Sequence, residues 1–465
     1  MAFERSEAGG IEEKELLRLE ALEAIENRDW KRAKDILSSW AAPDIAELFR
    51  EIDPKDRPII LRLLPQDLQA DVFFELDGNT QEYILRSLPD EYVKSIVDEL
   101  DPDERTRIFE RLSPRLLRRL LNLLSSEERK EALQLLGYPE NSVGRLMTPD
   151  YVAIKQNWTI SKALEHIREW GKDSETIDIV YVVDDKWVLL DDLPIRKLLL
   201  ANPEDLVQSI MDYEVVSINA DQDQEEAIKL ARRYNLIALP VTDSEGHLLG
   251  IVTIDDLLDV IQEEHTEDFV KYSAIEAPPE NIEFLTNIKE APITKILRSR
   301  LTWLTILLVM DFITGGIIRA FEDTIARYIV LVTFLPVLVD TAGNAGSQAA
   351  TLVIRALALE TVRLKDWLYL LGRELMIASI LGFIMGLGIS IMGIIRSGSL
   401  KVCLVVVLSM IINVIVGSLV GVLLPFIFVK MKRDPAAASM PLITTLADII
   451  GTAIYLGIAT LVLGL

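Results

Sequence analysis

The sequence predicts a multidomain protein that combines an α-helical superhelix, a pair of α/β domains and an α-helical transmembrane bundle. Three observations lead to this prediction. Short amphipathic segments fill the first part of the chain, and a strand, turn, strand, helix pattern then occurs twice. From Leu301 onward, long apolar runs replace the charged sequence. A soluble region followed by a membrane region is therefore expected.

The first region, residues 1–138, predicts a stack of short helices. Its apolar residues recur with a 3.6-residue period, and Leu-Pro-type turns restart the pattern, as in "LLPQDLQADVFFEL" and "SLPDEYVKSIVDEL". Each helix is too short to be stable alone, so we expect the helices to stack into a superhelix. The N-terminus, "MAFERSEAGG", lacks the basic region and apolar core of a signal peptide.

Two similar α/β halves are predicted next, over residues 139–203 and 204–262. "GRLMTPDYVAI" begins the first half, and "QSIMDYEVVSI" repeats its texture in the second. "IDIVYVVDD" and "ALPVTDSEGHLLGIVTIDDLLDVI" are typical of strands that lead into a helix.

A strongly acidic connection, residues 263–298, is predicted to join these halves to the membrane region. The helix that leads into it is "DDLLDVIQEEHTEDFVKY". Six of its carboxylates lie on about three turns: Asp256, Asp259, Glu263, Glu264, Glu267 and Asp268. A solvated acidic face is the ordinary explanation of such a run. Like charges packed in a dimer would instead repel each other unless cations screen them.

Five spans are predicted in the membrane region, residues 299–465, because five stretches of about 20 residues carry few or no charges. They are Leu301–Ile318, Ile325–Val339 continuing through a Gly-rich break to about Ala356, Leu375–Ile395, Val402–Val429 and Ala436–Leu465.

The basic residues beside the spans predict the orientation. The richer side holds Lys295, Arg298, Arg300, Arg363, Lys365, Arg373, Lys430, Lys432 and Arg433; the other holds Arg319, Arg327, Arg396 and Lys401. The soluble region is therefore expected in the cytoplasm, in a cell (inner) membrane protein whose C-terminus lies outside.

Asp448 lies in the otherwise uncharged last span and is a candidate ion-pathway residue. A carboxylate at bilayer depth costs on the order of 2.5–3.5 kcal/mol. Pro441 suits a helix start, and Thr444 and Thr445 would share one helical face with Asp448. The alternative is a protonated Asp448 that hydrogen-bonds to a neighbouring helix.

A second candidate is "LPVLVDTAGNAGSQAAT", Leu335 to Thr351. Its glycines, with Asn344, Ser347 and Gln348, are expected to open the helix or to let another backbone approach closely. Asp340 in the same stretch favours a pore-lining role. Tight packing through small residues is the alternative explanation.

Composition narrows the ligand to a hard cation. The formal charge is −24, from 48 basic and 72 acidic residues, which argues against nucleic acid as a partner. One cysteine, Cys403, and three histidines, His166, His247 and His265, provide neither a disulfide framework nor a zinc site. Asp, Asn, Gln, Thr and carbonyl oxygens suit Mg²⁺, which one or two carboxylates hold through its waters. One Asp448 from each of two subunits would do this.

The paired α/β halves resemble a tandem pair of cystathionine-β-synthase (CBS) domains. "GIVTIDDL" in the second half matches the family's strand-to-helix element, where Thr253 and Asp256 take positions that hold an adenine nucleotide in many members. The first half offers "WVLLDDL", which lacks the Gly and Thr. The resemblance therefore implies ATP or another adenine nucleotide as a possible ligand of the second half.

The whole chain resembles the MgtE family of magnesium channels and transporters. The domain order, "GNAGSQ" and "DPAAASMPLITTLAD" carry this resemblance over nearly all of the sequence. It implies a homodimer in the lipid bilayer with one central pore. The family's pore carboxylate would be Asp448. Together with the candidates from the two stretches above, the predicted pore residues are Asp448, Asn344, Ser347, Thr445 and Asp340.

The resemblance also implies regulation by cytosolic Mg²⁺. The helix that follows the CBS pair would act as a plug, held closed by Mg²⁺ bound to acidic residues. The matching positions here are Asp103, Asp223, Glu225, Asp256, Asp259, Glu264, Glu267, Asp268 and Asp434. Ser347 replaces an Asn of some members, and Arg107 and Asn235 stand where the family has acids, so one or two regulatory ions are expected to be missing or weaker.

The function predicted is passive Mg²⁺ uptake through a pore that cytosolic Mg²⁺ closes. Neither a phosphate-binding loop nor a nucleophile with its base is present, so no enzymatic activity is expected. A proton-coupled divalent-cation transporter, in which Asp448 titrates, is the first alternative. A membrane-tethered nucleotide sensor that conducts no ions is the second.

Overall fold

The computed structural model describes residues 15–275, 291–359 and 361–464. Part of the predicted connection, 276–290, lies outside these residues, as does Leu465. The described chain forms two compact units, Met1–Gln262 and Glu263–Leu465.

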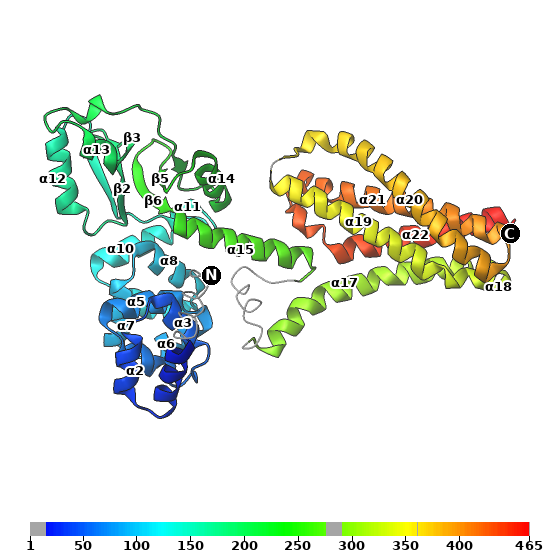
Figure 1. Ribbon diagram of the computed structural model, residues 1–465, viewed down its shortest axis with the longest axis horizontal. Helices are drawn as coiled ribbons and strands as arrows, with labels where there is room; N and C mark the ends of the chain where they lie inside the picture. Colours follow the sequence, from blue (N-terminus) through cyan, green and yellow to red (C-terminus); the bar gives the residue numbers. More distant parts are fainter. Residues whose placement is uncertain (1–14, 276–290, 360, 465) are drawn as a thin grey trace, which may run out of the picture. The chain divides into compact units, whose positions relative to one another are not determined.

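The first unit begins with a stack of short helices, as predicted (Figure 1). Alternate helices pack on each other, so that α3 contacts α5, α5 contacts α7, and α7 contacts α9. Their bounds are α2 (Trp30–Leu37), α3 (Ala42–Phe49), α4 (Arg57–Leu63), α5 (Gln66–Glu75), α6 (Gly78–Ser87), α7 (Asp90–Glu99), α8 (Pro102–Arg111), α9 (Pro114–Leu123) and α10 (Ser126–Leu135).

A leucine repeat ends these helices. The residue that follows each of α4 to α9 is a leucine in an extended backbone conformation: Leu64, Leu76, Leu88, Leu100, Leu112 and Leu124. All but Leu112 are buried in the core of the stack, and Leu112 packs against it. Each leucine therefore stops one helix and anchors the turn to the next, which explains why such short helices are stable.

The two α/β halves are also present as predicted. In the described part of the chain each holds a three-stranded sheet, with β1 parallel to β2 and β2 antiparallel to β3 in the first, and β4, β5 and β6 related likewise in the second. The elements are α11 (Val143–Leu146), β1 (Tyr151–Lys155), α12 (Ile160–Trp170), β2 (Thr176–Val183), β3 (Leu189–Pro194), α13 (Ile195–Leu200), η1 (Val207–Ser209), β4 (Ile218–Asn219), α14 (Gln224–Tyr234), β5 (Ala238–Thr242) and β6 (Leu248–Thr253).

The acidic segment forms one helix, α15 (Ile254–Tyr272), that follows β6 directly. Its last turns, from Glu263, belong to the second unit.

Five helices of the described residues are long and apolar enough to cross a membrane. Three of them, 293–320, 364–397 and 400–430, extend beyond the predicted apolar runs at both ends, because lysine and arginine side chains extend from the helix ends while their stems stay on apolar surface. The second span begins at Ile329, later than predicted, and the last, Met440–Leu463, lies inside the predicted Ala436–Leu465. The elements are α17 (Ile293–Ala320), α18 (Glu322–Arg327), η3 (Ile329–Thr333), α19 (Leu335–Ala358), η4 (Leu364–Asp366), α20 (Trp367–Ser397), α21 (Leu400–Lys430), η5 (Pro435–Ala437) and α22 (Met440–Leu463). Helices α19, α21 and α22 pack on one another (Figure 1).

The predicted opening of the Gly-rich stretch is wrong. Helix α19 is continuous from Leu335 to Ala358. The other expectation, a close backbone approach, is confirmed: a Cβ on Gly421 of α21 would lie 2.0 Å from the carbonyl oxygen of Gly346. Small residues here bring two backbones into contact, and the helical hydrogen bonds remain intact.

Candidate functional site

Asp448 lies in the third turn of α22, a helix that has Pro441 in its first turn. It is half-buried, and Thr445 beside it is buried. The Thr444 hydroxyl donates to the carbonyl of Met440 at 2.8 Å, so its proton is used within the same helix. Asp448 is the one acidic residue of α22, so its carboxylate is the negative charge that this helix offers to a cation.

An exposed polar stripe runs along α19. Asp340, Asn344, Gln348 and Thr351, the stripe residues, recur at intervals of three or four and are exposed in the single chain. The Asn344 amide donates to Asp340 Oδ2 at 3.2 Å. Exposed polar groups at membrane depth are tolerated where they face water or another protein surface.

Ser347 differs from the stripe residues, because it is 6% exposed and its hydroxyl has no hydrogen-bond partner among the described residues. Its backbone carbonyl accepts from the Thr351 hydroxyl at 2.7 Å. Of the five predicted pore residues, Asp340 and Asn344 are thus exposed and paired with each other, Asp448 is half-buried, and Ser347 and Thr445 are buried.

Asp311 of α17 is a candidate residue that the sequence analysis did not single out. Helix α17 packs against α22, and Asp311 and Asp340 are the two acidic groups that act electrostatically on Asp448. Three carboxylates from three different spans therefore lie in one region of the membrane unit. The signal was available, since an ionisable residue within a span is a functional candidate by default.

The last turn of α15 makes polar contacts with Asp434, just before η5, and with α19. Lys271 Nζ forms ion pairs with Glu267 on its own helix and with Asp434 Oδ2, at 2.7 Å for the latter. Burial opposes the charge of Lys271, but its hydrogen bonds to Asp434 and Glu267 outweigh burial and raise its pKa. The Tyr272 hydroxyl donates to the carbonyl of Ser347 at 3.2 Å. Glu267 and Asp434, both predicted regulatory residues, are thus brought together around one lysine.

A second group of carboxylates surrounds the start of α8. This α8 acid cluster consists of Asp101, Asp103, Glu104, Glu175 and Asp256. Burial raises the pKa of Asp103 far above its usual range, and the charges of Asp256 and Glu175 add to the effect. Burial and Asp101 raise the pKa of Glu104 to about 8, and burial and Asp101 raise that of Glu175 to about 7. One carboxylate oxygen of Asp103 has no hydrogen-bond partner among the described residues.

An arginine stands beside this cluster. Arg107 Nη1 pairs with Asp259 Oδ2 at 2.7 Å and so links α8 to α15. The guanidinium of Arg107 thus offsets the charge of Asp259, one of the carboxylates predicted to be regulatory.

Four further predicted site residues lie in the second α/β half or directly after it: Asp223, Glu225, Thr253 and Asp256. Asp223 caps α14 by accepting from the Glu225 amide at 2.9 Å, and both side chains are exposed. The Thr253 hydroxyl donates to Asp256 Oδ2 at 2.8 Å, so the two candidate nucleotide ligands touch. Among the described residues, no three His, Cys, Asp or Glu side chains converge closely enough to hold one metal ion directly.

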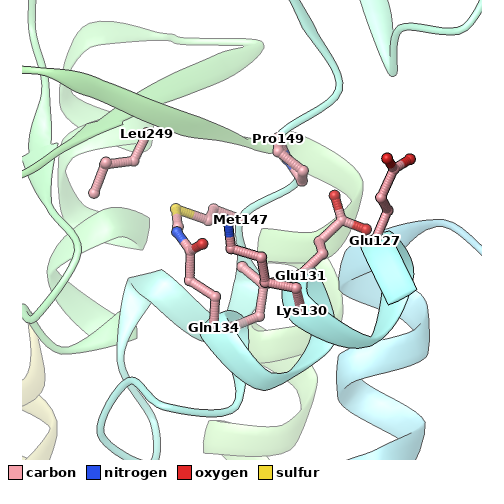
Figure 2. A pocket seen from close by; sticks show the side chains of 8 residues that line it. Glu127, Lys130, Glu131, Gln134, Met147, Pro149 and Leu249 are labelled. Carbon is pink, nitrogen blue, oxygen red and sulfur yellow. The ribbon is translucent and has the colours of Figure 1, made fainter. Parts of the chain in front are cut away.

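A cavity of about 290 Å³ lies elsewhere in the first unit, between α10, the stretch around Met147 and β6 (Figure 2). Glu127, Lys130, Glu131 and Gln134 of α10 line one side of it, and Pro149 and Leu249 line the other. None of the predicted ion or nucleotide residues lines this cavity.

The α8 acid cluster predicts a stability that falls as pH rises. A carboxyl whose folded-state pKa is raised binds protons more tightly when folded, so its stabilisation is complete below its ordinary pKa and is lost as pH passes the raised value. For Glu104 this window runs from 4.5 to about 8. Without divalent cations, we expect the first unit to have a lower melting temperature at high pH than at mildly acidic pH. The corresponding loss in the free energy of unfolding is on the order of 1–3 kcal/mol.

Thermal unfolding of the full chain, followed by tryptophan fluorescence with a chelator present, measures this difference. Glu104→Gln should remove part of it, whereas Glu91→Gln, on an exposed position of α7, should not. An equal pH response in the native chain and Glu104→Gln would contradict the prediction.

The fold and the site together define a membrane transport protein that carries a helical module and a CBS pair. A family model described as "Divalent cation transporter" matches residues 335–458, one described as "MgtE intracellular N domain" matches residues 40–141, and a CBS domain model matches residues 207–263. The magnesium transporter MgtE of Thermus thermophilus is 38% identical over 336 residues, which cover 72% of each chain. That of Bacillus subtilis is 38% identical over 331 residues, covering 71% of this chain and 72% of the relative.

Two solved structures match the first unit. The cytosolic domain of the Mg²⁺ channel MgtE in complex with ATP has a TM-score of 0.51 and 35% identity, covering 52% of this chain and 99% of its own. The soluble part of a magnesium transporter has a TM-score of 0.50 and 29% identity, covering 54% and 99%. The chain belongs to the MgtE family of magnesium transporters.

Proposed function

We propose that the chain forms a homodimeric pore for passive Mg²⁺ uptake, and that cytosolic Mg²⁺ closes this pore. The observation that carries the proposal is the exposed polar stripe of α19 next to Asp448. A lipid-facing stripe of this kind would leave a carboxylate and an amide in hydrocarbon, at a cost of several kcal/mol. A second subunit, with water between the two stripes, removes that cost.

The donor set fits Mg²⁺ as the transported ion. Asp448, Asp340 and the Asn344 amide offer hard oxygen ligands, and in the part of the chain that the structure describes no three carboxylates converge on one metal position. Mg²⁺ dehydrates reluctantly and is commonly held through its waters by one or two carboxylates. Spaced carboxylates that attract a hydrated ion therefore suit passage, because they bind it without trapping it.

The regulatory part of the proposal rests on charge. The acid positions Asp103, Asp223, Glu225, Asp256, Asp259, Glu264, Glu267, Asp268 and Asp434 are proposed as the residues that bind cytosolic Mg²⁺ in the closed state. Their mutual repulsion would favour an open arrangement when ions leave. We also propose that the soluble part of the chain lies in the cytoplasm and that the C-terminus lies outside. We propose the corresponding domain division: helical stack 1–138, CBS halves 139–203 and 204–262, acidic connection 263–298 and membrane region 299–465.

Adenine nucleotide binding to the CBS pair is a second proposed property. It is favoured by the ATP complex of the solved relative. Thr253 and Asp256 would supply hydroxyl and carboxylate groups to the ligand, and their present hydrogen bond to each other would have to rearrange.

Influx of Mg²⁺ into liposomes that contain the native chain and a trapped Mg²⁺ dye tests the main proposal. Flux that stops at high Mg²⁺ on the cytoplasmic face would support both pore and gate. Flux that a pH gradient drives, without inhibition by Mg²⁺, would favour proton coupling instead. Nucleotide binding without any flux would favour the sensor alternative.

Asp311 provides a more specific prediction. Asp311→Asn is expected to lower Mg²⁺ influx about three- to tenfold, because one negative charge near Asp448 contributes on the order of 1 kcal/mol to cation attraction. The same liposome measurement applies, with Asp323→Asn, an exposed position of α18, as the matched control. Equal reductions in the two variants would contradict a specific role for Asp311.

A further inference from the structure

The end of α15 is held to the membrane unit by a cation that belongs to the chain itself. Lys271 Nζ lies 2.7 Å from Asp434 Oδ2 and also pairs with Glu267. Asp434 uses its other oxygen, Oδ1, to accept from the Ala436 amide at 2.8 Å at the start of η5. Both oxygens of Asp434 are therefore engaged, and a divalent ion that needs Asp434 Oδ2 must take it from Lys271.

The surrounding charges make this position sensitive to a cation. Burial raises the pKa of Asp268, and the charge of Asp434 adds to this effect, whereas Lys271 lowers it. Glu267 and Asp434 therefore pair with Lys271 directly, and Asp268 is a third carboxylate in the same region. Three negative charges and one positive charge leave a net charge of −2. This excess matches one divalent ion, which would also have to approach against the positive charge of Lys271.

The next residue, Tyr272, connects this position to α19, the helix that carries the exposed polar stripe. Tyr272 follows Lys271 and contacts α19 at the carbonyl of Ser347 and at the hydroxyl of Thr351, a member of the exposed polar stripe. A lysine that holds the last turn of α15 in place therefore also holds Tyr272 against the helix that carries the stripe.

We infer that Lys271 is a built-in competitor of the regulatory ion: it holds α15 against the membrane helices when divalent ions are absent, and Mg²⁺ displaces it from Glu267 and Asp434. This inference rests on the proposed function, because it assigns a role to Lys271 within the proposed closing mechanism. The native channel would then be partly closed without Mg²⁺ and would require more Mg²⁺ to close fully than the three carboxylates alone would.

Competition has a signature that mere support of α15 lacks. Lys271→Gln removes the ion pairs that hold the end of α15. Mg²⁺ influx with no Mg²⁺ on the cytoplasmic face should therefore rise about three- to fivefold. Because the competitor is also lost, the Mg²⁺ concentration that halves this influx should fall by a similar factor. A lysine that only stabilised the closed arrangement would instead give a higher influx together with a higher half-closing concentration.

Liposome influx of the full chain, titrated with cytoplasmic-face Mg²⁺, measures both quantities. Lys271→Arg keeps the charge and should behave almost like the native chain. Lys229→Gln, which removes a lysine from a comparable helical pair with Glu226 at 2.7 Å, should leave both quantities unchanged. An unchanged half-closing concentration in Lys271→Gln, or one that rises, would overturn the inference.

Hydrogen exchange separates failure of this inference from failure of the proposed function. In chelator, the amides of the last turn of α15 should exchange faster in Lys271→Gln than in the native chain, and this readout does not require flux. The Mg²⁺ concentration that restores protection in Lys271→Gln should be lower than the concentration that changes exchange in the native chain. Unaltered exchange in the variant would show that Lys271 does not hold the end of α15, even if the native chain conducts Mg²⁺.

Discussion

Replacing Asp448 by asparagine is expected to abolish Mg²⁺ influx. Asparagine keeps the size and an oxygen ligand but removes the charge, so the change isolates electrostatics from packing. A unit charge about 4 Å from an ion contributes on the order of 4 kcal/mol at an effective dielectric constant of about 20, and the effect on a divalent ion is larger. A loss of at least about a hundredfold in influx is therefore expected.

Dye-loaded liposomes with matched protein content measure the loss. Asparagine has nearly the same size as aspartate, so the variant should elute as the native chain does in size-exclusion chromatography. Asp323→Asn, outside the membrane-spanning helices, serves as the control and should conduct normally. Substantial Mg²⁺ influx through Asp448→Asn would show that the pore proposal assigns its central residue wrongly.

The sequence contained most of the fold because the fold depends largely on local patterns. Uncharged runs marked the spans, and restarted amphipathic segments marked the helical stack, since each signal lies within about 20 residues. The Gly-rich stretch was harder to interpret. Glycines within a helix are compatible with a break or with a close contact, and the deciding partners, Gly417 and Gly421, lie on a different helix.

The candidate site was predictable where a residue is unusual in its own segment, as Asp448 and Asp340 are. Contacts between distant segments were not predictable in this way. Lys271 meets Asp434 across 163 residues, and Asp311 approaches Asp448 through the packing of α17 on α22. The burial of Ser347 and Thr445 likewise depends on which face of each helix is turned inward. Such facts depend on tertiary packing, which one sequence does not specify locally.

Gly421→Ala is expected to disrupt the membrane unit. A methyl group on this residue would lie 2.0 Å from the carbonyl oxygen of Gly346 and 2.8 Å from its carbonyl carbon. Both are backbone atoms, so a side-chain rotation cannot relieve the clash, and α19 must move away from α21. Alanine is the better helix former by up to about 1 kcal/mol. Overpacking of this kind costs more, typically about 1–3 kcal/mol.

The movement would also disturb the pore face, because α19 carries close contacts on one side and the exposed polar stripe on the other. Gly346 and Gly343 meet α21 and α22, whereas Asp340 and Asn344 lie on the exposed face. A displacement of α19 therefore moves the stripe relative to Asp448. We expect Gly421→Ala to lower the melting temperature in detergent and to reduce Mg²⁺ influx at least about tenfold.

Gly388→Ala, on α20, provides the matched control, since a methyl group there would meet nothing within 4 Å. It should leave the melting temperature equal or slightly higher, because it gains helix propensity without a clash. If Gly421→Ala were as stable and as active as Gly388→Ala, the close approach of α19 and α21 would not be a feature of the working protein. If both variants lost activity, small residues in these spans would be needed for another reason, such as contact with a second subunit.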